Sequence, residues 1–103
     1  MRRSAPEIYN MTRSDRIIAA AIELAEELGY QEVTRDAVAA VAGCSEGLVL
    51  YHHKNINELK GAIIEHAIKT ENLTVLAQAI VVDDPRVQDA PAELKRKAIE
   101  SFL

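Results

Sequence analysis

The chain has 103 residues, of which 49% are hydrophobic, so it can form one domain that buries roughly 60 to 70% of its unfolded surface. This length excludes a second full domain. The formal net charge of −4 excludes a uniformly basic surface, and Cys44, the only cysteine, cannot form an intramolecular disulfide. No apolar run resembles a signal peptide or is long enough to span a membrane, so we expect a cytoplasmic protein without membrane association.

The first residues carry a local excess of positive charge. Before Ile17 two acidic residues stand against four arginines, which are Arg2, Arg3, Arg13 and Arg16. We expect residues 1–13 to form a flexible basic arm, with Ser14 as the N-cap of a first helix. The apolar stripe of this helix is predicted to comprise Ile18, Ala21, Ile22, Ala25 and Leu28.

Two short helices are predicted to follow, joined by a tight turn. Thr34 can cap the first of them, in which apolar residues recur at helical spacing up to Ala42. Gly43 follows at a position where a helix end favours positive φ, and Ser45 can cap a second helix that runs towards His53. Two helices joined in this way by a turn that contains glycine form a helix-turn-helix, whose second helix reads DNA bases.

The C-terminal part is predicted to be helical as well. Asn55 or Asn57 begins a long helix, which carries an apolar residue on each turn and ends near Val82, before the helix-breaking sequence Asp83-Asp84-Pro85. A last amphipathic helix follows Pro91 and covers residues 92–103. We therefore predict an all-α fold, with a three-helix DNA-binding domain over residues 14–63 and a helical dimerisation region over residues 64–103.

The spacing of several residues between Ile17 and Ile63 is characteristic of one family. These residues are Ile17, Ala20, Ala21, Leu24, Gly29, Tyr30, Thr34, Val38, Ala39, Ala42, Gly43, Ser45, Gly47, Val49, Tyr51, His52, Lys54, Asn55 and Leu59. In the identity and spacing of these residues, the segment resembles the N-terminal DNA-binding domain of the TetR family of regulators. The match requires no insertion or deletion. The chain departs from the family pattern at Leu48, Leu50, His53 and Ile56, which makes the expected recognition surface less polar and less basic.

The resemblance implies contacts with double-stranded DNA. Backbone N–H groups and hydroxyls at Thr34 and Ser45 would contact phosphates, which the helix dipole also favours. Tyr51 would lie near base edges, and His52 would bond a phosphate. The alternative for Thr34 and Ser45 is that they only cap helices, and the alternative for Tyr51 is that it packs in the core.

Other residues near the second helix are candidate contacts because of their position. Arg35 and Lys54 stand at the start of one helix and just beyond the next, which suits phosphates on either side of a groove, although both could be ordinary surface charges. Glu46, Gly47 and Leu48 belong to the expected exposed face. Glu46 could accept a hydrogen bond from cytosine N4, and Leu48 could contact a thymine methyl group.

The apolar faces of the C-terminal helices must be buried against another surface, and the small N-terminal core is not large enough to bury them. We predict a homodimer that sets two recognition helices about 34 to 36 Å apart. Its interface residues would be Leu73, Leu76, Ile80, Ile99 and Phe102. The alternative is that the last helix folds back on its own chain.

These observations favour a sequence-specific DNA-binding regulator, most simply a repressor that occupies a short palindrome through residues 46–53. A protein-binding adaptor or antagonist of a transcription complex, and a shortened sensor of an apolar ligand, are the alternatives. The region after the first helices is too short for the usual inducer-binding bundle of the family, so no small-molecule inducer is expected. We also expect no cofactor, metal or catalytic site, because the chain has neither metal-ligand spacing nor a glycine-rich phosphate loop.

Overall fold

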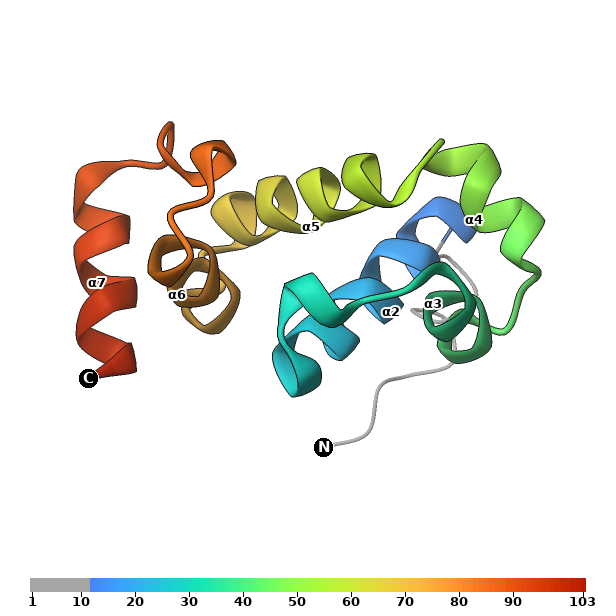
Figure 1. Cartoon of the computed structure of the whole chain (residues 1–103), viewed down its shortest axis with the longest axis horizontal. Coiled ribbons are helices and arrows are strands. Elements are labelled where there is room, and N and C mark those ends of the chain that lie inside the picture. Colours follow the sequence, from blue (N-terminus) through green and yellow to red (C-terminus); the bar gives the residue numbers. More distant parts are fainter. Residues whose placement is uncertain (1–11) are drawn as a thin grey trace.

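The computed structural model describes residues 12–103, and these residues form helices and turns only, which confirms the all-α prediction (Figure 1). The residues predicted as a basic arm lie outside the described part of the chain, except for the last two. The helices are α2 (Arg13–Leu28), α3 (Arg35–Ala42), α4 (Glu46–His52), α5 (Ile56–Thr70), α6 (Leu73–Val81) and α7 (Ala92–Phe102), with short 3-10 helices η1 (Tyr30–Glu32) and η2 (Pro85–Val87).

The N-cap of the first helix lies two residues before the predicted cap. Thr12 is the N-cap of α2: its Oγ1 accepts a hydrogen bond from Asp15 N at 3.0 Å, and the Asp15 carboxylate accepts one from Thr12 N at 3.4 Å. This reciprocal pair satisfies two N–H groups that the helix itself leaves unbonded. The assignment of Ser14 as the cap was therefore wrong, because Ser14 already lies within the first turn.

The buried face of α2 is also rotated relative to the predicted stripe. Ala21 and Ala25 are buried as expected, but Ile18 and Ile22 are only half-buried, and Leu28 is 55% exposed. The helix packs against α3, α5 and α6, and these neighbours cover a face centred one position earlier. The residues of α2 buried on this face are Ile17, Ala20, Ala21, Leu24 and Ala25.

The predicted long helix is broken into α5 and α6. Glu71 adopts a left-handed conformation with φ 57°, and Asn72 then caps α6 by accepting a hydrogen bond from Val75 N at 3.1 Å. The Asn72 side chain also donates to Glu26 Oε2 at 2.8 Å, which joins the break to α2. No glycine or proline marks this position, so helix-breaker residues gave no warning of it.

The last helix folds back on its own chain, as the alternative prediction stated. α7 packs along α6, and Leu94 and Ala98 face the core. Figure 1 shows α5 crossing the molecule from α4 at one end to α6 and α7 at the other. One continuous apolar core therefore joins the helix-turn-helix part to the C-terminal helices.

A glutamine on α6 links the C-terminal helices to the helix-turn-helix part at the point where α2 ends. Gln78 Nε2 donates to the carbonyl of Ala25 at 2.9 Å, and its Oε1 accepts from Tyr30 N at 2.9 Å. Gly29 stands between them at φ 95°, a region that favours glycine. Gln78 thus satisfies both a carbonyl near the end of one helix and the N–H that follows the chain reversal.

Candidate nucleic-acid interface

The turn between α3 and α4 has the predicted geometry. Gly43 adopts the left-handed conformation, with φ 73° and ψ 40°, and its N–H donates to the carbonyl of Ala39. Cys44 N donates to the same carbonyl at 3.0 Å, and α4 begins two residues later. From α2, Arg16 Nη2 donates to the carbonyl of Ala42 at 3.1 Å. These bonds hold the turn against α3 and α2, so the point from which α4 starts is fixed by its scaffold.

Helix α4 has one buried and one exposed side. Val49 is completely buried, whereas Tyr51 is 79% exposed, which excludes the alternative that Tyr51 packs in the core. Its ring meets that of the half-buried His52 edge to face, with the centroids 5.2 Å apart. Glu46 and Gly47 are exposed as expected. The outer side of α4 therefore presents a polar helix start and a projecting aromatic ring.

The position of Leu48 differs from that of a purely exposed residue. It is half-buried and packs against the core, so only part of its side chain reaches the surface. Leu50, another position where the chain departs from the family pattern, is likewise half-buried. The apolar residues of α4 thus contribute to packing, and the strip that a protein partner could cover is smaller than the sequence suggested.

Both predicted caps at the helix starts are present. Thr34 Oγ1 accepts from Ala37 N at 3.4 Å, and Ser45 Oγ accepts from Leu48 N at 3.1 Å. A third cap belongs to α5, where Asn55 Oδ1 accepts from Glu58 N at 2.8 Å. This result settles the choice between Asn55 and Asn57 in favour of Asn55.

The starts of α3, α4 and α5 border one surface hollow. Its lining residues are Thr34, Arg35, Asp36, Glu46, Asn55 and Ile56. N–H groups that point out of helix starts favour anions, and the starts of α3 and α5 meet here. The sequence pattern had indicated Thr34 and Arg35 but had not placed Asn55 beside them, since 20 residues separate the segments.

The charges around this hollow are mixed. Among the described residues Arg35 is its only cation, and it stands with the acidic residues Asp36 and Glu46. The hydrogen bond with the Thr34 side chain lowers the pKa of Asp36, so this exposed carboxylate stays ionised at neutral pH. The groups at this hollow that favour an anion are therefore the helix starts, Arg35 and Lys54, which is exposed just before Asn55.

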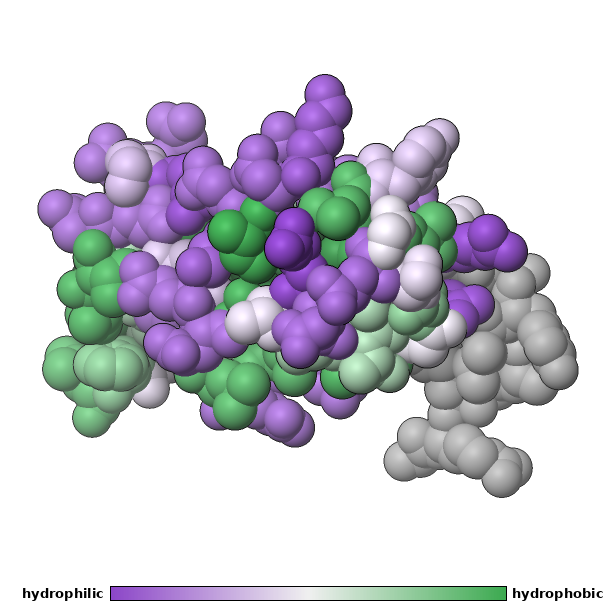
Figure 2. All heavy atoms as spheres, turned by 45° about the vertical axis from the view of Figure 1, so that its right-hand side comes forward, coloured by the Kyte–Doolittle hydropathy of each residue, from purple (hydrophilic) through white to green (hydrophobic). Residues whose placement is uncertain are grey.

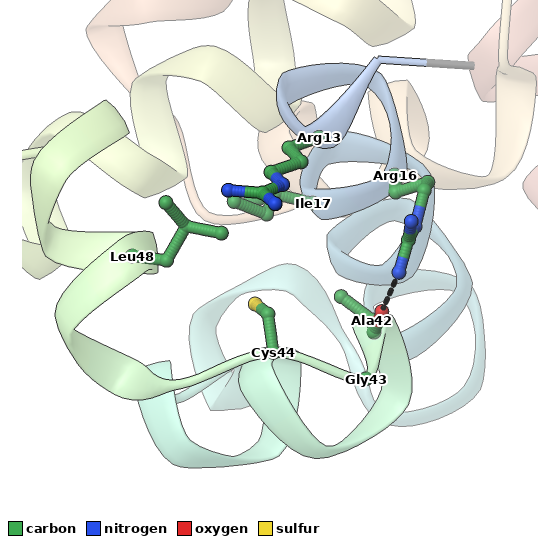
Figure 3. Close-up of a pocket in the computed structure, with 7 residues that line it drawn as sticks. All are labelled: Arg13, Arg16, Ile17, Ala42, Gly43, Cys44 and Leu48. Atoms are coloured by element: carbon green, nitrogen blue, oxygen red, sulfur yellow. Dashed lines mark hydrogen bonds between the residues drawn. The ribbon is translucent and has the colours of Figure 1, made fainter. Parts of the chain in front are cut away.

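A second hollow lies on the opposite side of α4, beside the turn (Figure 3). Arg13 and Arg16 reach it from the first turn of α2, and the Cys44 sulfur and the Leu48 side chain line it from the turn and α4. Both arginines had been assigned to the N-terminal basic region. The fold brings their positive charge next to Leu48 of α4, so two arginines that were not candidate DNA contacts lie beside a residue that was.

The residue after α4 is directed inward. His53 is half-buried, and its Nε2 is a buried atom without a hydrogen-bond partner among the described residues, as is Nδ1 of His66 on α5. Burial, followed by the charge of His52, lowers the pKa of His53, so His53 is neutral at physiological pH. His53 can therefore pack in this half-buried position in its uncharged form.

The proposed dimer residues fall into three groups. Leu76 is completely buried within the single chain, which leaves it no surface for a partner and removes it from the predicted interface. Leu73 and Ile80 are half-buried against the same core. Ile99 and Phe102 are 43% and 61% exposed.

More apolar surface lies near the end of α7. Leu28, Val81, Val82 and Phe102 line one hollow between the ends of α2, α6 and α7. Figure 2 shows apolar side chains gathered at this end of the molecule, at the lower left. We call the residues Leu28, Val81, Val82, Ile99 and Phe102 the C-terminal apolar patch; each of them is more than 40% exposed.

Metal ligands and membrane spans are two further features that bear on function. Within residues 12–103 no three His, Cys, Asp or Glu side chains are grouped so that they could hold a metal ion. No helix in the same range has the length and apolar character needed to cross a membrane.

Comparison with known proteins agrees with the geometry. Residues 17–63 match the model of the family described as bacterial regulatory proteins, tetR family. No curated protein and no solved structure is significantly similar to the chain. The matched segment begins in α2, contains the α3–turn–α4 unit with its exposed Tyr51 and ends within α5. Residues 17–63 therefore form an N-terminal helix-turn-helix DNA-binding domain of the TetR family.

Proposed function

We propose that the chain acts as a homodimeric repressor that binds a short palindromic operator through α4. The observation that carries this proposal is the two-sided character of α4: Val49 anchors it in the core while Tyr51 projects outward. A recognition helix needs both properties, because it must be held rigidly and must expose side chains to the major groove. Repression follows most simply from occlusion of a promoter by the bound dimer.

The contacts divide into those that position the protein and those that read sequence. Thr34, Arg35, Ser45, His52 and Lys54 are proposed to contact phosphates, in keeping with the capped helix starts. The residues proposed to face base edges are Glu46, Gly47, Leu48 and Tyr51. Leu48 offers only part of its side chain, so we assign it the smaller share of base recognition.

The dimer is proposed to form through the C-terminal apolar patch. Apolar surface gathered on one side of a small protein marks an interaction site, and a two-fold dimer covers the same patch on both copies. Leu73 and Ile80 can contribute only their exposed parts. The arrangement would place two copies of α4 about 34 to 36 Å apart, one turn of B-form DNA. It includes no small-molecule inducer.

DNA binding can be tested by selecting bound fragments from random duplex DNA at low salt. An inverted repeat is the expected product, and the affinity for it should fall steeply as the salt concentration rises. Replacement of Lys54 with Ala should weaken binding to all sequences alike, whereas replacement of Tyr51 with Ala should change the preferred sequence. Recovery of no consensus at low salt would favour the protein-binding alternative.

Dimer formation can be tested separately by sedimentation at micromolar concentration. The expected species has twice the 11.4 kDa mass of the chain. Phe102→Glu should shift the equilibrium to the monomer because it places a charge in the patch. Ala92→Glu is the matched control, since it adds the same charge at the other, exposed end of α7. A monomer in all three samples contradicts the dimer.

A further inference from the structure

The side chain of Arg86 in η2 reaches the first turn of α5. Its Nη1 donates to the main-chain carbonyl of Asn57 at 2.8 Å and approaches Asn57 Oδ1 at 3.4 Å. Asn57 is the second residue of α5, which follows directly on the recognition helix and its short connection. A residue of the C-terminal part therefore holds the helix-turn-helix domain at the point where α5 begins.

Arg86 is itself held rigidly by a buried carboxylate. Asp84 Oδ1 accepts from Arg86 Nε at 3.0 Å and from its main-chain N at 2.9 Å, and Oδ2 accepts from Nη2 at 2.8 Å. Oδ2 also accepts from the hydroxyl of the buried Tyr30 at 2.6 Å, and Asp84 is only 7% exposed. A guanidinium paired in this two-pronged way has a defined orientation.

The carboxyl group of Asp84 stays ionised over the physiological pH range. The hydrogen bonds from Arg86, with that from Tyr30 adding to them, hold the pKa of Asp84 well below its usual value. The carboxylate therefore stays charged and keeps Arg86 in place.

The stem of Arg86 also lies close against α5. A Cβ built on Gly61 would stand 3.5 Å from Arg86 Nη1 and 3.6 Å from its Cδ. Gly61 is one turn beyond Asn57, so the arginine covers the first two turns of the helix. Because a helix is stiff over such a length, fixing Asn57 also fixes the cap residue Asn55 two positions earlier.

Asn55 is the residue that connects this contact with the DNA interface. With Ile56 it borders the hollow that Thr34, Arg35 and Glu46 form at the starts of α3 and α4. Lys54 immediately precedes it, and the N–H of Lys54 donates to Glu58 Oε1 at 3.2 Å within the same first turn. Movement of the start of α5 would displace both residues relative to α3.

We propose that Arg86 is a positioning residue for DNA binding, which holds the first turn of α5 so that Lys54 and Asn55 meet the phosphate backbone together with the start of α3. The proposal rests on the proposed function, since it assigns no DNA contact to Arg86 itself. It also gives the C-terminal part a role in the interface: whatever displaces η2 displaces the start of α5.

The test is the substitution Arg86→Lys in the full chain. Lysine keeps the charge, but one ammonium cannot bond Asp84 in two places and Asn57 at once. We expect binding to the selected duplex to weaken about tenfold, with the slope of log affinity against log salt shallower by about 0.9 for each phosphate that the protein no longer neutralises. The backbone amide signals of residues 54–57 should shift in the free protein.

Arg96→Lys on α7 is the matched control. Arg96 also pairs with two carboxylates, those of Glu93 and Glu100, but it is exposed and its side-chain hydrogen bonds stay within α7. Its replacement should leave DNA affinity and the salt slope unchanged.

A combined variant separates positioning from a general loss of stability. In a background that carries both Lys54→Ala and Asn55→Ala, Arg86→Lys should cost much less than tenfold, because the interactions that it positions are already absent. An equal loss in both backgrounds, or unchanged affinity of the folded Arg86→Lys protein, overturns the inference. The proposed function fails by a different result, namely that the unmodified chain selects no duplex.

Discussion

The hydroxyl of Tyr30 provides a sharp test of how the two parts of the chain are joined. Tyr30 is 1% exposed, and its OH donates to Asp84 Oδ2 at 2.6 Å, a hydrogen bond to a charged acceptor inside the protein. Phenylalanine fills the same space without the donor, so Tyr30→Phe removes this bond and little else. Hydrogen bonds to charged groups contribute about 1.5 to 3 kcal/mol. We expect the free energy of unfolding to fall by about that amount.

Urea and thermal unfolding followed by circular dichroism measure this loss. For a domain of this size, a loss of about 2 kcal/mol corresponds to roughly 8 to 16 °C in Tm. Tyr51→Phe is the matched control, because its ring is 79% exposed and surface substitutions usually change stability by less than about 0.5 kcal/mol. If Tyr30→Phe is no more destabilising than this control, the buried bond does not hold the parts together.

The pH dependence gives an independent check on the same residue. Burial, and then the hydrogen bond with Asp84, raise the pKa of Tyr30 well above its usual value of 10.0. The unfolded chain therefore loses this proton first as the pH rises, so the contribution of Tyr30 is complete below about pH 10 and decreases above it. The unmodified protein should lose stability from about pH 10 to about pH 11.5 more steeply than Tyr30→Phe does. Parallel curves would contradict the assigned shift.

Three further substitutions test local features of the fold. Glu71→Gly should stabilise the protein by up to about 1 kcal/mol, because Glu71 has φ 57° and glycine adopts this conformation freely. The control Glu23→Gly, inside α2, should instead cost about 1 kcal/mol. Equal effects of both substitutions in urea unfolding would refute the assignment of the helix break at Glu71. Leu76→Ala should lower the unfolding free energy by about 2 to 5 kcal/mol, and the loss should not depend on protein concentration, because Leu76 is buried within one chain. A loss that depends on concentration would place Leu76 in an interface instead. Ser45→Ala should cost about 0.5 to 2 kcal/mol in thermal unfolding through loss of the α4 cap, and an unchanged Tm would show that the cap contributes nothing.

The helix-turn-helix could be predicted in detail because its signals are local. Thr34 and Ser45 bond N–H groups three residues away, and Gly43 takes the left-handed conformation that its sequence position indicated. Such features depend on neighbouring residues only, so the sequence displays them directly. The prediction of Pro91 before the last helix succeeded for the same reason.

Other predictions failed where local signals were weak or competed with each other. Thr12 and Ser14 are both suitable caps, and Thr12 prevails because Asp15 lies three residues after it and completes the reciprocal bonds. The break at Glu71 carries no glycine or proline, and it is stabilised by the bond of Asn72 to Glu26, 46 residues away. A contact at that separation cannot be recognised from helical periodicity.

The sequence alone determined where most helices start and stop, the family of the N-terminal domain and the outward orientation expected for its second helix. The tertiary structure decided which face of α2 is buried, that α7 folds back on α6, and that Leu76 belongs to the core. It also brought together Arg86 and Asn57, which are 29 residues apart. The physical reason is that caps and turns depend on bonds within a few residues, whereas burial and long-range pairing depend on surfaces that exist only after the chain has folded.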